Sequence, residues 1–178
     1  ADGGYVRDNA SCRGKKEREK MKVNAVILNY NDADTVETLV HSICGYESLE
    51  HIILVDNHSQ DDSRQRLQQL ARENEKIQLV FLEENGGYGK GNNAGVRFAV
   101  RENQADYVLI SNPDVVFSEK CLKKMLHVFE SHPDVAAVTA RMEDARYGTQ
   151  KNAWPLRGFW GELLSMGPVS RRLFRPSG

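Results

Sequence analysis

The 178-residue chain lacks the features that would place it in several specialised classes of protein. Its three cysteines, Cys12, Cys44 and Cys121, are too far apart for a disulfide framework or a metal-ligand spacing, which favours a reducing cytoplasm. Its net charge is only −1, so no overall field attracts nucleic acid or an acidic membrane. No apolar run approaches the roughly 18 residues that span a bilayer. We therefore expect a cytoplasmic protein that does not bind nucleic acid.

The chain divides into three parts by composition. Residues 1–20 are polar, contain a charged run and lack the apolar core of a signal peptide, so we interpret them as a leader outside the fold. Residues 21–145 alternate between short apolar runs and helical patterns, as expected of one α/β domain. Residues 146–178 break this alternation and contain both tryptophans, Trp154 and Trp160.

Strands and helices are predicted to alternate without interruption from residue 22 to residue 139. The five predicted strands are apolar segments at residues 23–28, 51–55, 77–82, 107–110 and 135–139. Between them, apolar side chains recur at helical spacing. Such alternation predicts an α/β fold with a doubly wound, mostly parallel, Rossmann-like sheet. The near-continuous apolar strands agree with a sheet that is covered on both faces.

Three helix starts carry candidate capping residues. Asp34 is followed three residues later by Glu37, which resembles a capping box for the first helix. Ser59 or a neighbour is expected to cap the second helix, at residues 61–74, and Ser118 to cap the fourth. These residues set the expected helix boundaries.

A polar corner, Ser-Asn-Pro-Asp at residues 111–114, follows the fourth predicted strand. The strand should end there because Pro113 has a fixed φ and no N–H. In open α/β sheets, ligands bind beyond the carboxyl ends of the strands, which places Asn112 and Asp114 where a ligand or metal would be met. The alternative is a plain turn, because these residue types are common in turns.

Two further strand ends carry carboxylates, Asp32 after the first strand and Asp56 at the end of the second. One aspartate in such a place is often only the N-cap of the following helix. Three carboxylates at the same edge of one sheet favour a functional site.

A glycine-rich loop at residues 84–95 leads into the third helix. Its five glycines, Gly86, Gly87, Gly89, Gly91 and Gly95, permit close approach of a ligand to the backbone, and the helix start that follows is a potential anion site. Lys90 could add a positive charge near a phosphate. The spacing is neither that of a Walker loop nor that of the dinucleotide fingerprint, so a flexible connection is an equal alternative.

Taken together, these strand ends and this loop suit a nucleoside diphosphate. Asp56 could bind the base or the ribose hydroxyls, and Asp114 could hold a divalent cation on the pyrophosphate, because Mg²⁺ is often bound by one or two carboxylates together with substrate phosphates. Such a cation would also neutralise charge on a departing nucleoside diphosphate.

Four segments in order, residues 26–31, 54–61, 85–95 and 111–114, resemble the family 2 glycosyltransferases of the GT-A fold, near the bacterial rhamnosyltransferase-like members. The resemblance covers about residues 22–157. It implies metal-assisted, inverting transfer of a sugar from a nucleotide-diphosphate sugar to a saccharide or lipid-linked acceptor, in cell-surface polysaccharide biosynthesis. The protein would then be cytoplasmic or peripheral at the inner face of the membrane, with residues 21–145 as its nucleotide-sugar-binding domain.

The resemblance also implies residue roles. Asp56 would contact the nucleoside, and Asp114 would be the last position of the D-x-D motif, binding Mg²⁺ or Mn²⁺, with Asn112 at the first position. The predicted nucleotide-sugar-binding residues are Asn29, Tyr30, Asn31, Asp56, Asn57, Gly86, Gly87, Gly89, Lys90, Asn92, Asn93 and Asn112.

No catalytic residue is assigned. Inverting members use an acidic general base from a later, acceptor-binding half, and the carboxylates after the fifth predicted strand, Glu143, Asp144 and Glu162, match no family motif. Residues 146–178 are expected to be the start of an incomplete acceptor-binding region, or an aromatic tail buried in a homodimer. The alternative to an enzyme is a non-catalytic nucleotide or nucleotide-sugar binding module that lacks the acceptor half.

Overall fold

The computed structural model describes residues 21–144 and 148–150. They belong to two units, residues 1–123 and 124–178, which are treated separately below. The predictions for the leader at residues 1–20 and for the aromatic tail from Trp154 onward lie outside the described residues.

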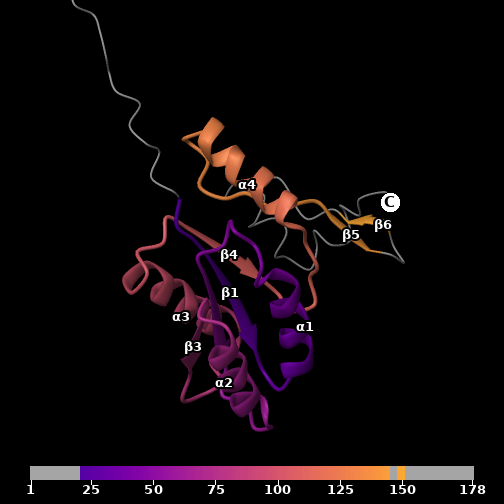
Figure 1. Ribbon diagram of the computed structural model, residues 1–178. Coiled ribbons are helices and arrows are strands. Elements are labelled where there is room, and N and C mark those ends of the chain that lie inside the picture. Colours follow the sequence, from indigo (N-terminus) through magenta and orange to yellow (C-terminus); the bar gives the residue numbers. More distant parts are fainter. Residues whose placement is uncertain (1–20, 145–147, 151–178) are drawn as a thin grey trace, which may run out of the picture. The chain divides into compact units, whose positions relative to one another are not determined.

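Helices and strands alternate along the described chain (Figure 1). In order they are β1 (Val23–Asn29), α1 (Ala33–Ile43), β2 (His51–Asp56), α2 (Ser63–Glu73), β3 (Ile77–Phe81), α3 (Gly87–Arg101), β4 (Tyr107–Ser111), α4 (Glu119–Ser131), β5 (Met142–Asp144) and β6 (Gly148–Gln150). None of these helices is both long and apolar enough to cross a membrane. The predicted alternation is confirmed as far as α4.

The first unit contains a four-stranded parallel sheet of order β3-β2-β1-β4. The chain builds outward from β1 through β2 to β3 and then crosses to the other side of β1 to form β4. The strand order therefore reverses between β1 and β4, as in a doubly wound sheet. Asn29 pairs with Asp56, and Ile27 pairs with Ser111, so the polar strand ends lie along one edge.

The fifth predicted strand is wrong. Residues 135–139 form no strand, and Val135 instead donates its N–H to the His132 carbonyl in a turn after α4. The next strand, β5, pairs antiparallel with β6 in a separate two-stranded sheet. The segment has β-branched residues, but strand propensity becomes structure only where a neighbouring strand offers a ladder.

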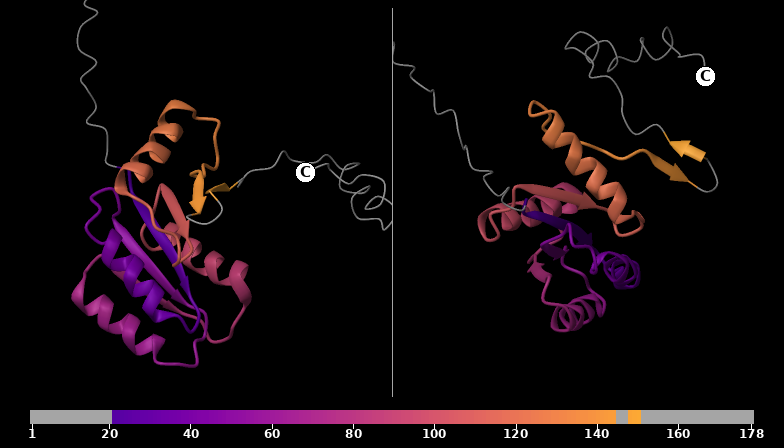
Figure 2. Two further views of the ribbon diagram at one scale, coloured as in Figure 1. Left: turned by 90° about the vertical axis from the view of Figure 1, so that its right-hand side faces the viewer. Right: turned by 45° about the horizontal axis from the view of Figure 1, so that its top comes forward.

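Helices cover both faces of the sheet. In the left view of Figure 2, α1 and α2 lie on one side and α3 lies on the other. The two central strands, β1 and β2, are buried almost throughout, which explains their continuous apolar sequences. Under α3, Val26, Ile53 and Val55 of the sheet pack with Ala99 in one core cluster.

Most of the predicted glycine-rich loop is helix, because α3 begins at Gly87. A Cβ at Gly91 would come within 2.4 Å of Leu28, and one at Gly95 would come within 2.4 Å of Val26 and 2.8 Å of Val55. These two glycines therefore let α3 lie directly on β1 and β2. The sequence interpretation had assigned the same glycines to close approach of a ligand.

We expect Gly95→Ala to lower the free energy of unfolding by about 1–3 kcal/mol, the usual cost of overpacking a filled core. The matched control is Gly89→Ala, because a Cβ at Gly89 meets nothing within 4 Å. Alanine there should stabilise α3 by up to about 1 kcal/mol through its higher helix propensity. Urea unfolding of both variants is the measurement, and equal stabilities would show that α3 can withdraw from the sheet without cost.

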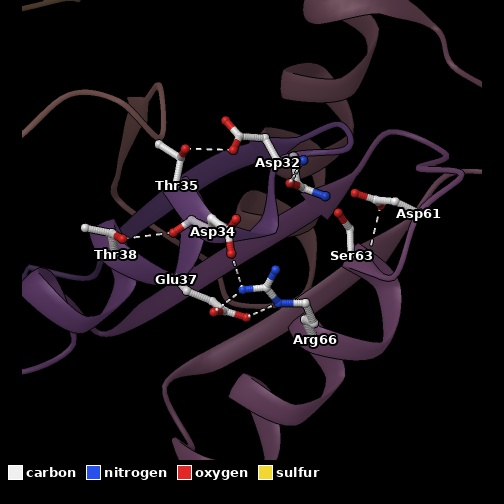
Figure 3. A network of polar contacts seen from close by, with 9 residues as sticks. Asp32, Asp34, Thr35, Glu37, Thr38, Asp61, Ser63 and Arg66 are labelled. Atoms are coloured by element: carbon white, nitrogen blue, oxygen red, sulfur yellow. Dashed lines mark hydrogen bonds and ion pairs between the residues drawn. The ribbon is translucent and has the colours of Figure 1, made fainter.

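An ion-pair cluster joins α1 to α2 (Figure 3). Arg66 of α2 donates from Nε and Nη2 to the two carboxylate oxygens of Glu37, at 2.8 and 2.6 Å, and from Nη2 to Asp34 Oδ1 at 2.6 Å. These hydrogen bonds raise the pKa of Arg66. The predicted capping box is therefore wrong, because Glu37 pairs with Arg66 and the helix begins one residue before Asp34.

Candidate functional site

The ends of β1 and β2 share one buried polar network. Asn29 Nδ2 donates to Asp56 Oδ1 at 3.0 Å, and the Ser59 hydroxyl donates to the same oxygen. The Ser59 N–H donates to Asp56 Oδ2 at 3.1 Å. The Asp56 side chain, only 2% exposed, thus gains the hydrogen bonds that a buried carboxylate needs. Ser59 serves this network rather than capping α2, which begins at Ser63.

The loops that follow β1 and β2 are also tied to each other. The Asn31 N–H donates to Ser59 Oγ at 2.9 Å, and Asn31 Oδ1 accepts from the Gln60 N–H at 2.7 Å. Asn31 and His58 both have left-handed backbones, with φ of 54° and 65°. Such conformations are uncommon outside glycine and persist where the surroundings fix them. Tyr30 is exposed beside them.

Two asparagines attach the start of α3 to the loop after β2. Asn57 Nδ2 donates to Asn85 Oδ1 at 2.8 Å, and Asn57 Oδ1 accepts from the Gly86 N–H at 3.2 Å. Asn85 Oδ1 also accepts from the Gly87 N–H at 2.9 Å. A phosphate bound at this helix start would have to compete with these two side chains for the N–H groups. Asn57 is buried, so its position is fixed by packing as well.

Lys90 is turned toward the start of its own helix, where it forms an ion pair with Glu84. Its side chain crosses Gly86 so closely that a Cβ there would lie 2.2 Å from Lys90 Cδ. Glycine at position 86 thus leaves room for the Lys90 side chain. The hydrogen bond from Lys90 holds the pKa of Glu84 below its ordinary value. A phosphate at this point would compete with Glu84 for the ammonium group.

The polar corner after β4 contacts α3 through a tyrosine. The Tyr88 hydroxyl donates to Asn112 Oδ1 at 2.8 Å. Ser111 is buried at the end of β4, whereas Asn112 and Asp114 are exposed. The corner thus faces solvent beside the switch point of the sheet, which is where open α/β folds bind ligands.

The oxygen atoms of this corner fit a hard divalent cation. Within residues 21–144 and 148–150, no three histidine, cysteine, aspartate or glutamate side chains gather into a metal site. The chain therefore offers the Asp114 carboxylate, with the Asn112 amide oxygen beside it already accepting from Tyr88, rather than a complete set of ligands. Mg²⁺ is often bound by one or two carboxylates and substrate phosphates, so this donor set suits a cation shared with a diphosphate.

The chain beyond the corner is anchored at the opposite, amino edge of the sheet. The Tyr46 hydroxyl donates to the Phe117 carbonyl at 2.7 Å, and the two rings meet edge to face. Glu119 Oε1 accepts from the N–H and the hydroxyl of Ser48, at 2.9 and 3.0 Å.

Ser118 caps α4 as predicted, since its Oγ accepts from the Cys121 N–H. The segment with Asp114 is thus fixed at both ends.

We expect acid to weaken this anchor. The Ser48 backbone N–H, together with Lys123, holds the pKa of Glu119 below its ordinary value of 4.5. The ionised carboxylate therefore adds stability above pH 4.5, and this is lost as the pH falls through the lowered pKa. In urea unfolding across this range, Glu119→Gln should lose part of the pH dependence that the control Glu83→Gln, at an exposed position, retains. Identical pH profiles of the two variants would contradict the assignment.

The remaining predicted site residues differ in burial and in their hydrogen-bond partners. Asn92 is buried within α3, where its Nδ2 donates to the Tyr88 carbonyl at 3.0 Å, while Asn93 and Gly89 are exposed. Asp32, the third strand-end carboxylate, accepts a hydrogen bond from the Thr35 hydroxyl at 2.7 Å. The backbone N–H of Asp32 donates to Asn29 Oδ1 at 3.3 Å, so Asp32 joins the Asn29–Asp56 network through its backbone, while its carboxylate is bonded to Thr35.

Three residues that organise this edge were not among the predicted site residues: Ser59, which was expected only as a helix cap, and Asn85 and Tyr88. A signal existed for Ser59, because an aspartate followed three residues later by serine is a common side-chain-to-backbone turn pattern. Asn85 directly precedes the glycine pair at the start of α3, a position where asparagine often satisfies free N–H groups. Nothing in the local sequence marked Tyr88, because its partner is 24 residues away.

A parallel sheet with these polar groups at its switch point defines a doubly wound α/β protein. The chain belongs to glycosyl transferase family 2, because the model of that family matches residues 25–172. The resemblance noted from the four sequence segments is thereby confirmed.

Several curated relatives are similar over the same region. The low-salt glycan biosynthesis hexosyltransferase Agl10 of Haloferax volcanii is 26% identical over 61% of this chain and 33% of its own length. TuaG of Bacillus subtilis strain 168, assigned as a teichuronic acid biosynthesis glycosyltransferase, is 34% identical over 60% of this chain and 41% of its own. Poly-beta-1,6-N-acetyl-D-glucosamine synthase of Staphylococcus epidermidis is 26% identical over 74% of this chain and 31% of its own. The chain thus spans about a third to two fifths of these relatives.

Solved structures share the fold. The mannosyltransferase PcManGT from Pyrobaculum calidifontis, in complex with GDP-Man and Mn²⁺, has a TM-score of 0.54 and 19% identity, covering 63% of this chain and 33% of that one. S. aureus TarS 1-349, in complex with UDP-GlcNAc, has a TM-score of 0.51 and 20% identity, covering 69% of this chain and 38% of that one. The GT-A class predicted from the sequence is confirmed.

Proposed function

We propose that this chain binds a nucleoside-diphosphate sugar at the carboxyl edge of β1, β2 and β4. It would be the donor-binding part of a glycosyltransferase that transfers the sugar to a glycan or a lipid-linked acceptor. The observation that carries the proposal is the convergence of the Asn29–Asp56 pair, the Asn57-bound start of α3 and the Asn112–Asp114 corner at the switch point. Family membership supports it, as do the nucleotide sugars in the PcManGT and TarS complexes.

Different residues would bind different parts of the donor. Asp56, held in place by Asn29 and Ser59, would accept hydrogen bonds from the nucleoside. Asp114, with Asn112 beside it, would hold Mg²⁺ or Mn²⁺ next to the diphosphate. When bound, such a cation neutralises the charge that develops on the leaving diphosphate. Lys90 would leave its ion pair with Glu84 and bind a phosphate of the donor instead.

The proposed reaction is an inverting displacement at the anomeric carbon. An acceptor hydroxyl would attack as a general base removes its proton, and the nucleoside diphosphate would leave from the opposite side. The residues of the donor site would orient the leaving nucleoside diphosphate and neutralise its charge. They would not serve as the general base for the acceptor. The names of the curated relatives support a glycan acceptor and a role in polysaccharide biosynthesis.

Calorimetry tests this proposal most directly. UDP-, dTDP- and GDP-linked sugars are titrated into the chain with and without Mn²⁺, and at least one is expected to bind more tightly when Mn²⁺ is present. Absence of binding to all three, with or without metal, would refute donor binding. Binding without any sugar transfer to added glycan or lipid-linked acceptors would instead favour a non-catalytic nucleotide-sugar binding module.

A further inference from the structure

The hydrogen bond between Tyr88 and Asn112 is the feature of this edge that the proposed function does not yet use. Tyr88 lies in the first turn of α3, and its side chain is 60% exposed. Its hydroxyl nevertheless donates to Asn112 Oδ1 at 2.8 Å, which joins the first turn of α3 to the corner after β4, 24 residues along the chain. An exposed hydroxyl gains little stability from such a bond, since water would serve equally well. The contact therefore matters more for geometry than for stability.

The bond determines how Asn112 presents its amide. A carboxamide has an oxygen that accepts hydrogen bonds and an NH₂ group that donates two. Because the Tyr88 hydroxyl donates to the oxygen, the oxygen faces α3 and one of its lone pairs is occupied. The NH₂ group then faces away from Tyr88. The NH₂ group can donate to a phosphate oxygen, whereas a cation at the amide oxygen would have to share that oxygen with the Tyr88 hydroxyl, so this orientation suits a phosphate better than a metal.

We propose that Tyr88 is a positioning residue that fixes the Asn112 amide so that its NH₂ group donates to a diphosphate oxygen of the bound nucleotide. Asn112 then recognises the diphosphate, and Asp114 alone supplies the protein carboxylate for the cation. This assignment rests on the proposed function, because it concerns the same donor site. It explains why an amide can stand where a second carboxylate would bring two negative charges close to the diphosphate.

The first test is a double-mutant cycle of Tyr88→Phe, Asn112→Ala and the double variant. The probes are the nucleoside diphosphate that the parent chain binds best, chosen from UDP, dTDP and GDP, and the corresponding nucleoside without phosphates. Tyr88→Phe should weaken diphosphate binding by about three- to tenfold, the loss expected when one hydrogen bond to a charged group is misaligned. It should leave nucleoside binding unchanged and have no further effect in the Asn112→Ala background.

The second test is Asn112→Asp, which replaces the NH₂ donor by an oxygen. Diphosphate binding without metal should weaken, and binding should come to depend more strongly on Mn²⁺ than in the parent chain. Urea unfolding of every variant checks that the fold is retained.

The outcomes separate this inference from the proposed function. If the parent chain binds no nucleoside diphosphate, the proposed function itself fails and this inference fails with it. If the parent binds but Tyr88→Phe binds equally well, the inference alone is overturned. It is also overturned if Tyr88→Phe weakens nucleoside binding, if its effect persists in the Asn112→Ala background, or if Asn112→Asp has the same metal dependence as the parent.

Discussion

Replacing Asp114 by alanine is expected to abolish the effect of Mn²⁺ on donor binding. Asp114 is the one carboxylate of the exposed corner after β4, and the Asn112 oxygen beside it is already engaged by Tyr88. Loss of the Asp114 carboxylate should lower the apparent Mn²⁺ affinity by about a hundredfold. This is the upper end of the loss that follows when even the outer shell of a metal site is disturbed. Calorimetric titration of Mn²⁺ in the presence of the nucleotide sugar measures this change.

The matched control for Asp114→Ala is Glu75→Ala. Glu75 is an exposed carboxylate in the connection that enters β3, at the amino edge of the same sheet. Its removal changes the net charge equally, so a purely long-range electrostatic effect would appear in both variants. Equal Mn²⁺ responses in the two variants, or an Asp114→Ala variant that still binds the donor more tightly with Mn²⁺, would remove the metal role from this corner.

The second large effect is expected at Asp56. Asp56→Ala should lower the free energy of unfolding by about 2–3 kcal/mol, because the buried Asn29 and the half-buried Ser59 would lose the charged acceptor of their hydrogen bonds. It should also remove donor binding, since the loops after β1 and β2 are fixed through the same network. Urea unfolding and calorimetry measure the two effects separately.

Asp32→Ala is the control for this network. Asp32 follows the neighbouring strand but is exposed, and its carboxylate accepts a hydrogen bond from the half-buried Thr35. Its loss should cost less than about 1 kcal/mol, because the Asp32 side chain is exposed and caps no N–H of α1. If Asp32→Ala and Asp56→Ala destabilise the fold equally, burial of the Asp56 carboxylate is not what organises this edge.

The glycines of α3 have a role that the local sequence does not reveal. Gly87, Gly91 and Gly95 recur every four residues, which is a helical spacing, yet glycine is a poor helix former and the stretch was interpreted as a loop. At Gly87 the backbone φ of 76° favours glycine. The reason for Gly91 and Gly95 lies in Leu28, Val26 and Val55, which leave no room for a Cβ. That reason is a property of the packed sheet and is absent from the segment itself.

Two of the three capping signals and one of the five strand signals failed for a related reason. Glu37 and Ser59 have the residue types that cap helices, but each is engaged by a more distant partner, Arg66 and Asp56 respectively. Residues 135–139 have strand propensity but no ladder. Local propensities differ by less than about 1 kcal/mol per residue, so a single long-range contact is enough to override them.

The sequence by itself determined the order of strands and helices as far as α4, the parallel sheet, and the residues that end its strands. These follow from local periodicity and from the rule that alternating elements make right-handed parallel crossovers. Only the tertiary structure decided that β4 lies beside β1, and hence that Tyr88 of α3 reaches Asn112. Strand neighbours and side-chain partners depend on packing between segments far apart in the chain, where the competing pairings cannot be ranked from local patterns.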